Sequence, residues 1–193
     1  CAYHGWTFDN SGRCLEVPGH PGEVPACALT SFEVREQDGL IWMREPGGPD
    51  AAPPRLEMTG AKGYTEVWSR FELEGSLFDV IENFLDPMHT HFVHPGLIRS
   101  AAKRKAVTIR IEPGEDAIDA VYLDEGASSG WIQRLLGVDL VRGIGRFRLP
   151  SIVEMDYWTA TFLRLRIVLL FTPSGAGKVQ MIGGFQGRHW FAL

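Results

Sequence analysis

A cluster of prolines and glycines over residues 46–56 most constrains how this chain folds. Its sequence, Pro-Gly-Gly-Pro-Asp-Ala-Ala-Pro-Pro-Arg-Leu, breaks both helical and strand periodicity. We therefore expect two domains, with residues 1–46 in the first, a linker over 47–63, and residues 64–193 in the second. A chain of 193 residues, 45% of them hydrophobic, is long enough for this division.

The first domain is predicted to be a small all-β module. Asp-Asn-Ser-Gly at 9–12 and Gln-Asp-Gly at 37–39 are turn signals of the kind that join antiparallel strands. They separate short strand-like runs at residues 6–8, 14–17, 31–35 and 40–43. Two hairpins are the simplest structure that these signals allow.

The second domain is predicted to combine one helix with a long antiparallel sheet. One apolar helix face is indicated by spacings of i, i+3, i+4, i+7 and i+8 at Leu77, Val80, Ile81, Phe84 and Leu85. Ser76 and Asp79 form a capping pattern at its start, and Pro87 limits its end. Strands are expected at residues 67–73, 107–111, 117–123, 152–158, 162–171 and 178–193, with a short helix at 131–136. The fold class is therefore α+β.

Composition excludes several classes of partner. The net charge is −5 and no block of like charge indicates a nucleic-acid or membrane arm. No apolar run reaches the ~18 residues of a membrane span. Three cysteines are too few for a disulfide framework, so we expect a reducing cytoplasm.

Cys1 and His4 stand in the run Cys-Ala-Tyr-His-Gly-Trp, a C-x-x-H pattern on a tight loop. A thiolate and an imidazole are half of the ligand set of a Rieske 2Fe–2S cluster, which takes two cysteines and two histidines. The same pattern can be half of a zinc site, or a chance occurrence. We interpret Cys14 and Cys27 as small buried residues and His20 as a surface loop residue, not as further ligands.

A second group of candidate ligands lies on and after the predicted helix: Asn83, Asp86, His89 and His94. Asp86 and His89 are one helical turn apart, so they can face the same way. His94 lies off that stripe, and flanking prolines allow an irregular path that returns it. Two imidazoles and a carboxylate form the facial triad of non-haem Fe(II) oxygenases. A histidine-rich surface loop is the alternative interpretation.

Both motifs resemble those of Rieske non-haem iron oxygenase α subunits. The run Cys-Ala-Tyr-His-Gly-Trp-Thr-Phe-Asp-Asn-Ser-Gly resembles the second ligand loop of Rieske oxygenases and ferredoxins, and the later run resembles their mononuclear-iron motif. The resemblance covers nearly the whole chain. It implies the C-terminal part of an all-β Rieske domain followed by an incomplete helix-grip catalytic domain.

Carried over residue by residue, the resemblance makes Cys1 and His4 cluster ligands, and His89 and His94 ligands of mononuclear Fe(II). Asp86 becomes the carboxylate that bridges a Rieske histidine of a neighbouring subunit to the first iron-ligating histidine. Such a carboxylate orients both rings and raises their basicity. The resemblance also implies that Asn83 helps to position this network, and that His91, which has no counterpart in the motif, is a local or pocket-lining residue.

The resemblance further implies that the chain is a fragment. The first Rieske Cys/His pair is expected upstream of Cys1, and the third iron ligand, an aspartate, is expected beyond Leu193. Four aspartates inside the chain are weaker candidates for that ligand, the best on strand context being Asp156 and the others Asp119, Asp124 and Asp139.

The implied activity is that of the oxygenase component of a Rieske mono- or dioxygenase. Electrons from NAD(P)H arrive through a reductase or ferredoxin and pass through the cluster to Fe(II), with O₂ as co-substrate. An aromatic or polycyclic substrate is then hydroxylated or dealkylated, as in aromatic hydrocarbon catabolism. The implied assembly of the full-length protein is a homotrimer, and the isolated fragment is expected to be inactive.

Two other functions stay open on the residues alone. The chain can be a Rieske-type electron carrier fused to a non-catalytic ligand-binding domain, in which Asp86, His89 and His94 are incidental. It can also be a sheet-and-helix binding module without redox function. The iron and sulfide content of the full-length protein distinguishes these hypotheses.

Overall fold

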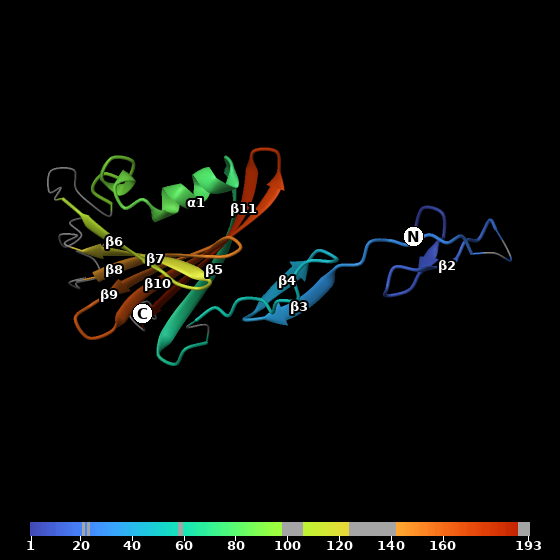
Figure 1. The fold of residues 1–193 in the computed structure, drawn as a ribbon, viewed down its shortest axis with the longest axis horizontal. Coiled ribbons are helices and arrows are strands. Elements are labelled where there is room, and N and C mark those ends of the chain that lie inside the picture. The colour runs from blue at the N-terminus through green and yellow to red at the C-terminus, as the bar shows by residue number, and fades with distance from the viewer. Residues whose placement is uncertain (21, 23, 58–59, 98–105, 124–141, 189–193) are drawn as a thin grey trace. The chain divides into compact units, whose positions relative to one another are not determined.

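The computed structural model describes residues 1–20, 22, 24–57, 60–97, 106–123 and 142–188. The chain forms two compact units, Cys1–Glu57 and Met58–Leu193. Their boundary falls inside the segment 47–63 that the sequence predicts as a linker. The two units are described separately below (Figure 1).

The first hairpin of the first unit pairs β1 (Thr7–Phe8) with β2 (Cys14–Glu16). Its turn is held by Asp9, whose carboxylate accepts the main-chain N–H groups of Ser11 and Arg13 at 2.9 Å each. This is the local side-chain hydrogen bonding that favours aspartate at turns. The predicted turn at residues 9–12 is therefore confirmed.

The second hairpin pairs β3 (Glu33–Gln37) with β4 (Leu40–Arg44). Asp38 and Gly39 have φ angles of 54° and 74°, the left-handed pair that a two-residue type I′ turn requires. The predicted second hairpin is confirmed, with β3 beginning and ending two residues later than expected.

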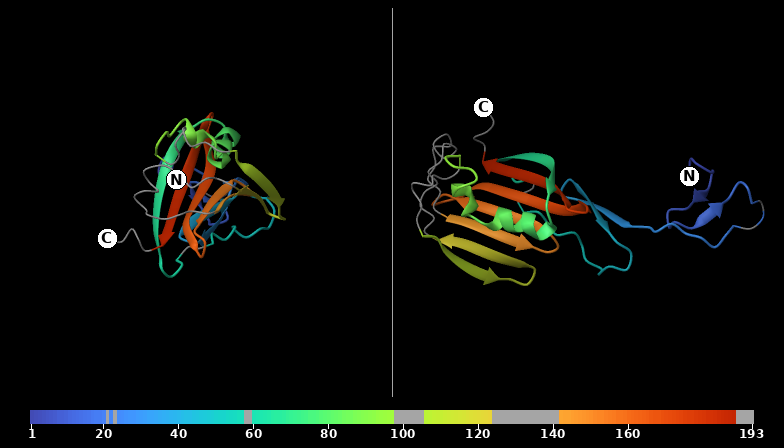
Figure 2. Two further views of the ribbon diagram at one scale, coloured as in Figure 1. Left: turned by 90° about the vertical axis from the view of Figure 1, so that its left-hand side faces the viewer. Right: turned by 90° about the horizontal axis from the view of Figure 1, so that it is seen from above.

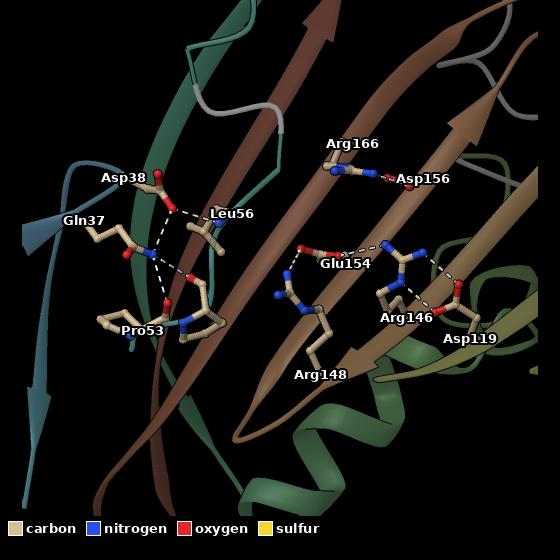
Figure 3. Close-up of polar contacts among 11 residues, drawn as sticks. Gln37, Asp38, Pro53, Leu56, Asp119, Arg146, Arg148, Glu154, Asp156 and Arg166 are labelled. Carbon is tan, nitrogen blue, oxygen red and sulfur yellow. Dashed lines mark hydrogen bonds and ion pairs between the residues drawn. The ribbon is translucent and has the colours of Figure 1, made fainter. Parts of the chain in front are cut away.

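The segment after this hairpin is tied to it. The Gln37 side chain donates to the main-chain oxygens of Pro53 and Pro54 at 3.1 and 3.2 Å, and the Asp38 carboxylate accepts the N–H of Leu56 at 2.8 Å (Figure 3). Leu56 is buried. Composition alone suggested a free linker here, but polar side chains of the hairpin turn order its second half.

The second unit contains a seven-stranded antiparallel sheet in the order β5-β11-β10-β9-β8-β7-β6. Six strands follow one another as a meander, and β5 joins β11 at one edge. The strands are β5 (Tyr64–Glu74), β6 (Thr108–Pro113), β7 (Ala117–Leu123), β8 (Arg142–Arg148), β9 (Ile152–Trp158), β10 (Leu163–Gly175) and β11 (Lys178–Arg188).

Helix α1 (Leu77–Leu85) spans the predicted helical residues and begins with the predicted cap. The Ser76 hydroxyl accepts the Asp79 N–H at 3.2 Å, while the Asp79 carboxylate accepts the Ser76 N–H at 3.3 Å. This reciprocal pair is a capping box. The helix ends before Asp86-Pro87, because a residue that precedes proline is driven to an extended conformation; Asp86 has φ −78° and ψ 112°.

The helix lies across one face of the sheet (Figures 1 and 2). Val80 and Ile81 of the helix are buried against the apolar residues of that face. The sheet residues of this core are Val153, Leu169, Phe171, Val179 and Met181. Each fully buried side chain of this size contributes roughly 1.5–3 kcal/mol relative to exposure.

The opposite face of the sheet carries a charged cluster next to buried apolar residues such as Ile152 and Val168. Successive residues of a strand point to opposite faces, so Glu154 and Asp156 lie on the far side from Val153. Arg166 pairs with Asp156, and Glu154 accepts from Arg146 at 3.3 Å and Arg148 at 3.0 Å (Figure 3). The core that contacts α1 and this ionic network therefore lie on opposite faces of the sheet.

Two further observations concern the predicted elements. Within the described ranges, no helix has both the length and the apolar character needed to cross a membrane. The helix predicted at residues 131–136 and the end of the last predicted strand, residues 189–193, lie outside the described residues.

Candidate functional site

The C-terminal end of α1 presents the first polar group of the site. Asp86 follows the last helical residue, and its N–H donates to the Glu82 oxygen at 2.9 Å. Its carboxylate then accepts the main-chain N–H groups of Met88 at 2.7 Å and His89 at 3.1 Å. The side chain of Asp86 therefore orders the turn that leads into the short 3₁₀ helix η1 (His89–His91).

The ring of His89 is fixed by Asp86. Nδ1 of His89 lies 2.6 Å from the main-chain oxygen of Asp86. A carbonyl oxygen can only accept, so Nδ1 carries the proton and Nε2 keeps its lone pair. The Asp86 carboxylate is 4.0 Å from the same Nδ1. A histidine held in this way presents Nε2 to a metal.

His94 approaches His89 across the irregular turn that follows η1. Their ring centroids are 5.8 Å apart and the ring planes are 78° apart. Two imidazoles that bind one ion through nitrogen at about 2.1 Å, at angles of about 90–110°, have ring centres roughly 4.5 to 5.3 Å apart. The observed separation is slightly wider, so the two rings lie close to the spacing that one shared ion requires. His89 is half-buried and His94 is exposed.

The other polar residues of the motif lie at different depths. Asn83 is exposed on α1, one turn before Asp86. His91 is buried, with 7% of its surface exposed, so it is not the surface histidine that a histidine-rich loop would place there. Burial of an imidazole next to the site agrees with a local packing role for His91.

A third protein ligand is not brought to this pair by the described residues. No three His, Cys, Asp or Glu side chains in the described part of the chain gather closely enough to hold a metal ion. Asp156 forms two hydrogen bonds with Arg166, at 2.5 and 2.6 Å, on the sheet face away from α1. Asp119 is likewise engaged with Arg146. Asp124 and Asp139 lie outside the described residues.

The Cys1–His4 loop closes on itself. The Gly5 N–H donates to the Cys1 oxygen at 2.9 Å, and Gly5 has φ +73°, a conformation that other residues rarely adopt. Both Cys1 and His4 are exposed. The loop therefore presents a thiol and an imidazole outward on one tight turn.

Two other cysteines of the first unit, Cys14 and Cys27, lie next to each other. The Cys14 N–H donates to the Cys27 oxygen at 3.1 Å, and both thiols are free. Burial, followed by the neighbouring Cys14 thiol, raises the pKa of Cys27. Cys14 is buried, as predicted, and Cys27 is half-buried. A raised pKa lowers the thiolate fraction, so Cys27 does not resemble an activated ligand.

Sequence reasoning missed two polar features of the second unit. The first is the ionic network on the outer sheet face, where hydrogen bonds from Arg146 to Asp119 raise the pKa of Arg146. The second is the hydrogen bond from the Tyr122 hydroxyl to the Leu85 oxygen at 2.7 Å. The hydrogen-bonding partners in these two features lie on different strands, or on a strand and the helix. The sequence does not show that they meet, because this depends on how the strands pair in the sheet.

Residues 76–189 match the family described as the vanillate O-demethylase oxygenase C-terminal domain. Two relatives match over most of the chain. One is the chloroplastic protein TIC 55 of Pisum sativum, 26% identical over 96% of this chain and 34% of its own length. The other is the putative toluene-4-sulfonate monooxygenase iron-sulfur subunit TsaM2 of Comamonas testosteroni, 31% identical over 92% of this chain and 50% of its own length.

A solved structure of NdmA from Pseudomonas putida CBB5 with caffeine superposes with a TM-score of 0.81. The match covers 99% of this chain and 56% of NdmA at 20% identity, so it establishes a shared fold. This chain spans between about a third and a half of the length of the two relatives named above.

Proposed function

Because the chain belongs to the Rieske oxygenase family, through a vanillate O-demethylase-type oxygenase C-terminal domain, we propose that it forms part of the oxygenase component of a Rieske non-haem iron mono- or dioxygenase. The observation that carries this proposal is the arrangement of Asp86, His89 and His94. Asp86 fixes the first imidazole, and the second imidazole lies beside it with a ring-centroid distance of 5.8 Å, close to the spacing that a shared ion requires.

In this proposal residues 1–46 are part of a Rieske domain and residues 64–193 are part of a helix-grip catalytic domain, joined through 47–63. Cys1 and His4 hold one side of the 2Fe–2S cluster. Their outward orientation supports this role, because the other two cluster ligands must come from a separate loop. Trp6 and Phe8 stack at a ring-centroid distance of 6.3 Å and supply an apolar flank, which helps to tune a cluster's potential.

His89 and His94 hold the mononuclear Fe(II), which when bound supplies the redox chemistry that activates O₂. Asp86 has two tasks. Its main-chain oxygen keeps the proton on Nδ1 of His89, and its carboxylate still has acceptor capacity after receiving two N–H groups. That capacity suits it to accept a Rieske histidine from a neighbouring subunit of a homotrimer. Asn83, one turn earlier on the exposed side of α1, supports the same contact.

The proposed substrate is an aromatic or polycyclic compound that is hydroxylated or oxidatively dealkylated. The names of two relatives support this class: one is a toluene-4-sulfonate monooxygenase subunit, and the other was solved with caffeine, an N-methylated heteroaromatic. A reductase or ferredoxin that draws on NAD(P)H is the proposed electron source. The reducing cytoplasm is the proposed compartment, on the small number of cysteines.

Metal and sulfide analysis of the full-length protein that contains this chain tests the proposal. We expect about three irons per chain, two of them with acid-labile sulfide. Two irons with full sulfide content would instead indicate an electron carrier without a catalytic iron. A protein that takes up neither iron nor sulfide would contradict the proposal altogether.

A further inference from the structure

The end of helix α1 is held from outside the helix. The last carbonyl groups of a helix have no partner inside it, and the last turn of α1 carries no basic side chain to satisfy them. The Leu85 oxygen instead accepts the hydroxyl of Tyr122 at 2.7 Å. Tyr122 lies on β7, so a strand of the sheet caps the helix that carries the candidate ligands.

The sheet keeps room for this contact. A Cβ atom on Gly145, in the neighbouring strand β8, would lie 2.6 Å from the Tyr122 oxygen and 3.2 Å from the nearest ring carbon. Real Cβ atoms do not approach other atoms so closely. Glycine at position 145 therefore lets the Tyr122 ring lie over β8 with its hydroxyl at the end of α1.

The capped carbonyl belongs to the peptide group that leads into Asp86. One end of this planar group, the Leu85 oxygen, is held by Tyr122, and the other end, the Asp86 N–H, is held by the Glu82 oxygen at 2.9 Å. Fixing both ends sets the direction in which Asp86 leaves the helix. Asp86 then contacts Nδ1 of His89 and the N–H groups of the following turn.

We propose that Tyr122 is a positioning residue for Asp86 and His89, and that Gly145 provides the space for its hydroxyl to do so. The proposal rests on the function proposed above for these two residues. Tyr122 acts through the Leu85–Asp86 peptide and touches neither Asp86 nor His89 in the contacts described. Outer residues that orient metal ligands commonly alter activity or metal affinity by about 10- to 100-fold when they are removed.

Tyr122→Phe in the full-length enzyme tests the role of the hydroxyl while keeping the ring. We expect kcat to fall about tenfold with little change in KM, since substrate contacts are untouched. The Fe(II) site should also give an altered electron paramagnetic resonance signal with nitric oxide as the probe, while the spectrum of the reduced 2Fe–2S cluster stays the same. The spectroscopic readout does not depend on turnover.

Tyr64→Phe is a matched control. The Tyr64 hydroxyl also donates to a main-chain oxygen, that of Leu163, at 2.8 Å, but it does so at the edge strand β5 and not at the end of α1. The two variants remove the same kind of hydrogen bond, and we expect similar losses of thermal stability. Only Tyr122→Phe should change kcat and the nitric oxide signal.

Gly145→Ala provides a second variant in which Tyr122 is intact but pushed from its place. It should change the nitric oxide signal in the same direction as Tyr122→Phe, and its effect should be smaller in the Tyr122→Phe background, where the closest clashing atom is absent. One outcome would overturn this proposal alone: the wild-type protein holds its mononuclear iron, but Tyr122→Phe and Tyr64→Phe have the same kcat and the same nitric oxide signal. A wild-type protein with no mononuclear iron would overturn both this proposal and the function on which it rests.

Discussion

Nδ1 of His89 lies 2.6 Å from the main-chain oxygen of Asp86, while the Asp86 carboxylate accepts the N–H of His89 at 3.1 Å. The two residues are therefore joined twice. The main chain of Asp86 holds the ring of His89, and the side chain of Asp86 holds the main chain of His89. The contact involves neighbouring residues of one turn. The first candidate ligand is oriented by the fold itself, which lowers the ordering that metal binding must impose.

Replacing Asp86 by alanine removes a negative charge and the acceptor of two N–H groups. We expect Asp86→Ala in the full-length enzyme to lower O₂-dependent turnover by about 10- to 100-fold, while the cluster remains reducible by dithionite. Stopped-flow reoxidation of the reduced cluster in air and steady-state turnover measure the two effects. Glu82→Ala, which removes an exposed carboxylate one turn earlier on the same helix, should leave both near wild type.

His89→Ala should release the mononuclear iron and spare the cluster. The reason is that His89 supplies one of only two imidazoles that meet at this site in the described residues. Iron per acid-labile sulfide should fall toward one, while the visible spectrum of the cluster is retained. His20→Ala, at a loop histidine in the other unit, serves as the control. Full retention of the third iron in His89→Ala would exclude its assignment as a ligand.

The buried pair Arg166–Asp156 should matter for stability and not for iron. The two side chains are 5% and 6% exposed, and removing one partner of a buried ion pair costs about 3–5 kcal/mol. Asp156→Ala should therefore lower the free energy of unfolding in urea by this amount. Replacing both partners by apolar residues, Asp156→Leu with Arg166→Met, should recover most of the loss. Iron content per folded molecule should stay constant in each variant.

The capping box at the start of α1 should show energetic coupling. Ser76→Ala removes the side-chain acceptor of the Asp79 N–H, and we expect a loss of about 1 kcal/mol. Asp79→Ala should cost a similar amount. Because the two side chains serve each other, the double variant should lose less than the sum of the single losses. Urea unfolding followed by circular dichroism measures all three, and strict additivity would contradict a reciprocal box.

The first unit should weaken in acid through Glu33. Hydrogen bonds from Arg35, followed by Arg44, hold the pKa of Glu33 below its usual value of 4.5. A carboxylate whose pKa is lowered by folding stabilises the folded state above that usual value, and the stabilisation disappears as pH falls through the folded-state pKa. Glu33→Gln should speed amide hydrogen exchange in β3 and β4 at pH 7. The difference from wild type should vanish well below pH 4.5.

Local signals predicted the elements whose causes are local. Helix α1 follows from apolar spacing, the cap at Ser76 and the proline after Asp86, all within a dozen residues. The hairpin at Asp38 follows from one Asp-Gly pair. Strand β8 was not predicted, because Gly143 and Gly145 weaken the strand pattern and its stability comes from neighbours on both sides.

The site could be predicted only in part for the same reason. Spacing placed Asp86 and His89 on one turn, and the structure brings His94 to them. The sequence spacing could not predict the contact between Tyr122 and Leu85, because these residues are 37 positions apart in the chain. Nor could the sequence predict that Asp156 lies on the sheet face away from α1. The strand pattern alone does not say which face of the sheet packs against the helix.

The edge pairing of β5 with β11 sets the order in which this unit can be built. Tyr64–Glu74 is the earliest strand of this sheet in the chain, and among the described strands it pairs with Lys178–Arg188, about a hundred residues later. On the ribosome the helix and its histidines therefore emerge well before the strand that closes the sheet beneath them. Distant pairings of this kind slow folding, because loop-closure entropy must be overcome before the contacts form. Among the described strands, the sheet beneath the candidate iron-binding turn is therefore complete only after this late pairing has formed.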